Sequence, residues 1–63
     1  MALLKRTTAK ALTYGDVILR DGERLMVEHI EPEFHGSMIE FRREFGGKSS
    51  IFMPYDEAVT LEL

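Results

Sequence analysis

The feature that most constrains the fold is a two-residue turn signal, Asp21-Gly22, set between two runs of β-branched and aliphatic residues. Val17-Ile18-Leu19 precedes the turn signal, and the segment from Glu23 to Ile30 follows it. In a type I′ turn both central residues take positive φ, which Asp and Gly tolerate better than most residues. The sequence therefore predicts an antiparallel hairpin that reverses at residues 21 and 22.

A second reversal is predicted at Gly46-Gly47. The segment before it, Met38 to Phe45, alternates between apolar and polar residues, and the segment from Lys48 to Met53 returns with the same period. A period of two residues indicates strands with one face toward a core. The side chains expected to face inward from this hairpin are Ile39, Phe41, Phe45, Ile51 and Met53.

The strand that returns from the first hairpin contains an irregularity. Leu25 and Val27 share one face, but Ile30 lies three residues beyond Val27 and would point to the other face of a regular strand. A bulge or a bend near Glu28 and His29 is therefore expected, and such irregularities help a small sheet to curl over its own core.

Five short strands emerge between residues 14 and 63. A turn at Tyr14-Gly15-Asp16 opens this region, a polar connection spans residues 31–36, a single helical or 3-10 turn is predicted at residues 54–57, and the last strand covers residues 58–63. The core residues expected from this pattern are Val17, Leu25, Val27, Ile39, Phe41, Ile51, Val59 and Leu61.

This arrangement resembles SH3-like small barrels, which place a single helical turn just before the last strand. The resemblance covers residues 14–63 and implies an all-β fold: a small five-stranded SH3-like barrel or a curled antiparallel sheet. SH3 domains that bind proline-rich peptides carry a tryptophan and an Ala-Leu-Tyr-Asp-Tyr motif, and both are absent from this sequence.

Residues 1–13 show neither strand alternation nor turn chemistry, and we interpret them as a basic, partly ordered arm from which Leu3, Leu4 or Leu12 packs on the body. Lys5, Arg6 and Lys10 give the arm a charge of +3, while the other five bases and all eleven acids lie in residues 14–63. The acidic body disfavours a nucleic-acid surface, because contacts with phosphates supply most non-specific affinity.

No catalytic motif is evident, the 63 residues include no cysteine, and no cofactor is predicted. The sharpest metal candidate is the alternating set His29, Glu31, Glu33 and His35, which would share one side of an extended strand. Pro32 interrupts that strand, so a solvated loop is favoured and no metal site is predicted. The sequence therefore favours a protein that is not an enzyme.

The preferred function is that of a protein-interaction module, and a small prokaryotic or phage accessory factor is the class that such a short chain suggests. The partner is another protein or a second copy of the chain, since the apolar last strand must either close a barrel or lie at an edge. The candidate partner-binding residues are Tyr14, Phe34, His35 and Tyr55.

Two alternatives remain open at this point. In the first, Lys5, Arg6 and Lys10 clamp a nucleic acid against a small barrel. In the second, the chain is a structural component of a larger assembly on which the arm orders. No apolar run approaches the roughly 18 residues of a membrane span, so no membrane contact is expected and the cytoplasm is the expected location.

Overall fold

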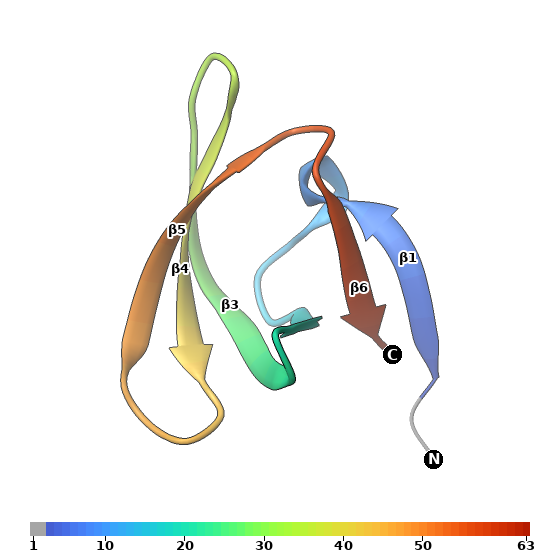
Figure 1. The fold of residues 1–63 in the computed structure, drawn as a ribbon. Coiled ribbons are helices and arrows are strands. Elements are labelled where there is room, and N and C mark those ends of the chain that lie inside the picture. The colour runs from blue at the N-terminus through green and yellow to red at the C-terminus, as the bar shows by residue number, and fades with distance from the viewer. Residues whose placement is uncertain (1–2) are drawn as a thin grey trace.

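The computed structural model describes residues 3–63 and contains a single antiparallel sheet (Figure 1). Its elements are β1 (Leu4–Thr8), a 3-10 turn η1 (Ala9–Ala11), β2 (Val17–Arg20), β3 (Glu23–Pro32), β4 (Gly36–Arg43), β5 (Lys48–Pro54) and β6 (Ala58–Glu62). The strand order is β1-β6-β2-β3-β4-β5, and the sheet curls without closing, so β1 and β5 are its two edges. The all-β fold class is confirmed, with six strands rather than five.

Both predicted hairpin turns are present. Asp21 and Gly22 have φ values of 52° and 77°, the two positive angles of a type I′ turn. Gly46 and Gly47 also have positive φ, at 104° and 83°. The second strand pair ends earlier than expected, because the Arg43 N–H donates to the Gly47 carbonyl at 3.0 Å and closes a loop over residues 44–46.

Phe45 corrects the sequence prediction. It lies in that loop rather than in β4, and its side chain is 83% exposed instead of facing the core. The alternating pattern continues through residue 45, but β4 ends at Arg43 and its ladder with β5 ends at the pair of Arg42 and Lys48, since the connection takes residues 44–47.

The irregularity expected near Glu28 and His29 is a confirmed shift of register between Val27 and His29 in the β3–β4 ladder. Beyond the shift, Ile30 pairs with Ile39 and packs against the core. The extra residue therefore returns Ile30 to the inner face, which a regular strand would not do.

The core lies inside the curl of the sheet and is centred on Phe41. Its fully buried side chains are Phe41, Ile18, Ile39, Met53 and Val27. Val17 was predicted to be inward, but Ile18 occupies the core position on β2 because it pairs with the buried Leu25, whereas Val17 pairs with Met26. Ile51 and Leu61 are partly buried and pack against the core.

The N-terminal segment differs most from expectation, because residues 4–8 form β1 and pair with β6. Ala9 and Leu12 are buried, whereas Leu3 and Leu4 are exposed. Most side chains of β1 are exposed on both faces, so the strand shows no alternation in sequence and is held mainly by its backbone pairing. Residues 1 and 2 of the predicted arm lie outside the described residues.

The last connection is a hydrogen-bonded turn, in which the Glu57 N–H donates to the Pro54 carbonyl at 3.0 Å, rather than the predicted helical or 3-10 turn, and the 3-10 turn of the described chain is η1. The Ala9 N–H donates to the Glu57 carbonyl at 2.9 Å and joins η1 to this last connection. Within residues 3–63 the structure has no helix long and apolar enough to cross a membrane.

Candidate interaction surface

The most prominent surface feature is the tip of the β3–β4 hairpin, which projects from one end of the molecule (Figure 1). The Glu33 N–H donates to the Gly36 carbonyl at 2.7 Å and closes the tip. Phe34 is 87% exposed there, and its ring meets the His35 ring edge to face with centroids 4.5 Å apart. The hairpin thus presents an aromatic pair to solvent on a closed turn.

Tyr55 fastens this tip to the rest of the protein. Its hydroxyl donates to the Glu33 carbonyl, and its N–H donates to the His35 carbonyl at 3.4 Å. The Lys10 N–H donates to the Tyr55 carbonyl at 3.1 Å, which ties η1 to the same point. Three of the four predicted partner-binding residues, Phe34, His35 and Tyr55, are therefore neighbours.

Tyr14 lies elsewhere. Its ring is exposed, and the neighbouring Gly15 N–H donates to the Val27 carbonyl at 2.9 Å in the middle of β3. Val27 is six residues from Glu33, which corresponds to about 20 Å along a strand. The structure does not bring Tyr14 together with the hairpin tip.

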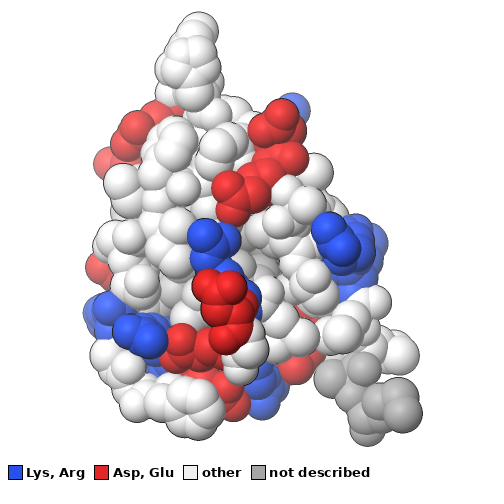
Figure 2. Space-filling view, viewed as in Figure 1, with Lys and Arg blue, Asp and Glu red and all other residues white. Residues whose placement is uncertain are grey.

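Acidic residues flank the tip. Glu33 and Asp56 form no ion pair within residues 3–63, and Glu31 pairs only with His29, at 3.6 Å between exposed side chains. Figure 2 shows an uncharged projection at the top of one face with acidic side chains on either side of it. The tip therefore combines an exposed ring with two carboxylates, those of Glu33 and Asp56, that form no ion pair in the described chain.

The basic residues divide into two groups. All five bases of the body form ion pairs with glutamates in the structure: Arg20, Arg24, Arg42, Arg43 and Lys48. Lys5, Arg6 and Lys10 are exposed and have no acidic partner in the described part of the chain. Lys5 is opposite Leu61 and Arg6 is opposite Thr60, so these two neighbours project to opposite faces of β1.

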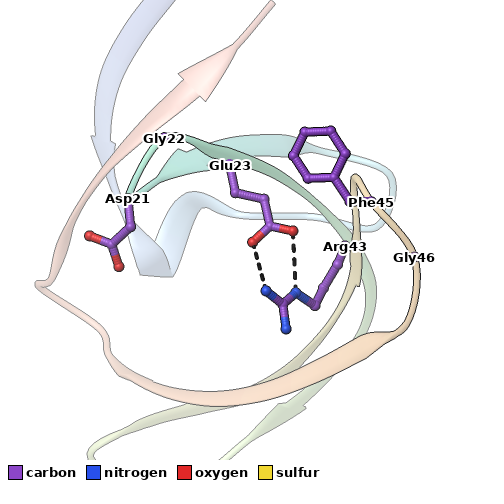
Figure 3. A pocket seen from close by; sticks show the side chains of 6 residues that line it. All are labelled: Asp21, Gly22, Glu23, Arg43, Phe45 and Gly46. Atoms are coloured by element: carbon purple, nitrogen blue, oxygen red, sulfur yellow. Dashed lines mark hydrogen bonds and ion pairs between the residues drawn. The ribbon is translucent and has the colours of Figure 1, made fainter.

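A hollow of about 480 Å³ lies at the other end of the molecule, where the two hairpin turns meet (Figure 3). Arg43 donates two hydrogen bonds to Glu23, at 3.1 and 3.2 Å, and that bonding together with the charge of the carboxylate raises the pKa of Arg43 above its ordinary value. Phe45 forms one wall. Sequence reasoning missed this hollow, because residues 21–23 and 43–46 are neighbours only in the folded chain.

The hollow offers little chemistry. Arg43 and Glu23 already form an ion pair with each other, and Asp21 is the remaining acid among the lining residues. Nowhere in residues 3–63 do three or more His, Cys, Asp or Glu side chains gather in a way that could hold a metal ion. The hairpin tip is therefore the surface with the clearest capacity for recognition.

Comparisons with protein-family models, with curated proteins and with solved structures found no match to this chain.

Proposed function

We propose that this protein is a non-enzymatic protein-interaction module that docks on another protein through its aromatic hairpin tip. The observation that carries the proposal is Phe34, an 87% exposed ring on a turn whose two flanking carbonyls both accept hydrogen bonds from Tyr55. Rigid aromatic side chains dominate the energy of many interfaces when they enter a pocket on the partner. A turn that is already closed also loses little entropy on binding.

The charges around the tip favour a particular kind of partner. Glu33 and Asp56 are acids without ion-pair partners in the described chain, and they lie on the two segments that meet at Tyr55. Complementary charge steers association and suppresses wrong partners. The proposed partner therefore presents an apolar pocket rimmed by Lys or Arg.

The test compares two exposed phenylalanines. After a partner has been isolated by affinity capture and purified, Phe34→Ala is expected to weaken its binding by about 2 kcal/mol, or roughly 30-fold, as for a central interface anchor. Phe45→Ala is the matched control, since Phe45 is 83% exposed at the opposite end. Isothermal calorimetry gives both affinities. Equal affinities of the two variants would refute the role of the tip. A turnover activity without any binding partner would refute the proposal that the protein is a non-enzymatic interaction module.

Nucleic-acid binding is the second candidate, and it is favoured by the lack of acidic partners for Lys5, Arg6 and Lys10 in the described chain. Because Lys5 and Arg6 project to opposite faces of β1, at most two of the three bases are expected to contact one backbone. Log affinity should then fall with log salt with a slope of about −2.

Fluorescence anisotropy with labelled single- and double-stranded DNA tests this candidate. The combined substitutions Lys5→Ala, Arg6→Ala and Lys10→Ala should abolish binding at low salt, whereas Lys48→Ala should have a small effect because Lys48 already pairs with Glu28 at 3.6 Å. If the unmodified protein bound neither DNA at low salt, nucleic-acid binding would be refuted as its function.

A further inference from the structure

The open edge of β5 has a defined pattern of free backbone groups. Just beyond the two ends of the β4–β5 ladder, the Tyr55 N–H donates to His35 and the Arg43 N–H donates to Gly47. Bonded and non-bonded pairs alternate along an antiparallel ladder, so the odd-numbered residues of β5 bond to β4. The backbone N–H and C=O groups of Ser50 and Phe52 therefore point to the open edge.

The same edge carries an exposed apolar pair. Phe52 is directly opposite Met38, and their side chains are 40% and 38% exposed on the outer face, because Met53 and Ile51 take the inner positions. Members of a non-bonded pair approach closely, so these two side chains form one apolar strip across β4 and β5. The strip ends at the sheet edge with nothing beyond it in residues 3–63.

We propose that β5 pairs antiparallel with β5 of a second copy of this chain, around a two-fold axis at Phe52. The two Phe52 residues then exchange both backbone hydrogen bonds, and the Ser50 N–H of each copy points toward the carbonyl of the partner's Pro54, which it shares with the Glu57 N–H that donates to this carbonyl at 3.0 Å within one chain. On the outer face, the side chains across the paired sheets then lie in the order Met38, Phe52, the partner's Phe52 and the partner's Met38. This association uses a different surface from the hairpin tip and does not depend on the proposed function.

Three observations select a second copy as the occupant. An isologous pair places the apolar strip against its own copy, so that each Phe52 gains the partner's Phe52 as a cross-strand neighbour while Met38 packs behind it on β4. Continuing this register directs Lys48, which pairs with Glu28 and Glu40 at 3.6 and 3.8 Å in its own chain, toward the turn that carries the partner's Asp56, an acid without an ion pair in the described chain. No like charges fall opposite each other in the paired segment from Ser50 to Pro54.

The other edge does not allow the same arrangement. On β1 the corresponding open-edge residues are Leu4, Arg6 and Thr8, because the Leu63 N–H donates to Leu3 and the Ala9 N–H donates to Glu57 at the two ends of the β1–β6 ladder. A two-fold pair centred on this strand would face Arg6 against the partner's Arg6. Charged side chains at an edge oppose such pairing.

The expected dimer is weak, because one short strand pair buries less than the roughly 1,200 Å² of a standard interface. Analytical ultracentrifugation from about 10 µM to 1 mM covers the affinity range of such transient contacts. The unmodified protein should change from monomer to dimer within that range, and a protein that stays monomeric throughout would overturn the proposal.

Proline substitutions test which residues of β5 point their backbone N–H groups to the open edge. Ser50→Pro removes an N–H that points to the open edge and no bond to β4, so the variant should fold, with thermal unfolding close to that of the unmodified protein, but should dimerise at least about tenfold more weakly. Ser49→Pro removes a ladder bond to β4 and should lower the melting temperature. A folded Ser50→Pro variant that dimerises normally would overturn the proposal.

Cysteine substitutions test the register, since the chain has no native cysteine. Across the proposed axis the Cα atoms at position 52 are about 5.5 Å apart, which suits a disulfide, whereas those at position 50 are about 14 Å apart. Under mild oxidation at high protein concentration, Phe52→Cys should therefore form a disulfide dimer much faster than Ser50→Cys. Faster cross-linking of Ser50→Cys, or equal rates for both variants, would exclude the proposed axis.

Discussion

Phe41→Ala is expected to unfold a large part of the protein population at 25 °C. Phe41 is 0% exposed at the centre of the core, and removal of a buried aromatic ring costs about 3–5 kcal/mol. At roughly 0.05–0.15 kcal/mol per residue, a domain of this length has only about 3–9 kcal/mol of unfolding free energy in total. Urea unfolding followed by circular dichroism measures the loss.

Phe45→Ala is the matched control, because it removes the same ring from a position that is 83% exposed. Its unfolding free energy should lie within about 0.5 kcal/mol of the unmodified protein. If the two variants lost equal stability, the assignment of Phe41 to the core and of Phe45 to the loop would be wrong.

Gly36→Ala is the second substitution with a large expected effect. A Cβ atom at this position would lie 2.4 Å from the carbonyl oxygen of Met53 and 2.8 Å from the Cα atom of Pro54. Both are backbone atoms, so relief requires β4 and β5 to move apart rather than a side chain to rotate. We expect a loss of about 1–3 kcal/mol, as for other overpacked sites, measured by urea unfolding.

Gly46→Ala is the control that distinguishes this steric crowding from the backbone strain of replacing a glycine with positive φ. Gly46 has a φ of 104° but nothing within 4 Å of an added Cβ atom, so its cost should be mainly conformational, at about 1–2 kcal/mol. The decisive contrast is structural. Gly36→Ala should shift the amide resonances of Met53 to Tyr55, whereas Gly46→Ala should change only its own loop. Unshifted β5 resonances in Gly36→Ala would contradict the close approach.

The position of Gly36 connects stability to the candidate surface. Its carbonyl closes the tip that carries Phe34, and it pairs with Pro54 next to Tyr55. Displacement of β5 from this residue would disturb the bonds from Tyr55 to Glu33 and His35. Reduced partner affinity is therefore an expected secondary result of Gly36→Ala even though Phe34 itself is intact.

Local signals in the sequence determined both hairpins and the irregularity in β3. Asp21-Gly22 supplies positive φ at two successive residues, and the three-residue step from Val27 to Ile30 requires an inserted residue if both face the core. These features depend on neighbours along the chain, so the residues themselves contain the information.

The tertiary structure decided the features that depend on distant partners. β1 has no alternating pattern, and β6 supplies its backbone hydrogen bonds from more than fifty residues away. Whether Val17 or Ile18 faces inward follows from the register with β3, because a shift of one residue exchanges the two faces of a strand.

For the candidate surface, too, some features were evident from the sequence and others were decided by the tertiary structure. Phe34 and His35 are adjacent in the chain, and their place in a polar connection was evident from the sequence. Their attachment to Tyr55, and the separation of Tyr14 from them, result from how the sheet curls. Turn type and periodicity are local properties of a sequence, whereas the meeting of two connections twenty residues apart is set by strand order and register, which only the packed core selects.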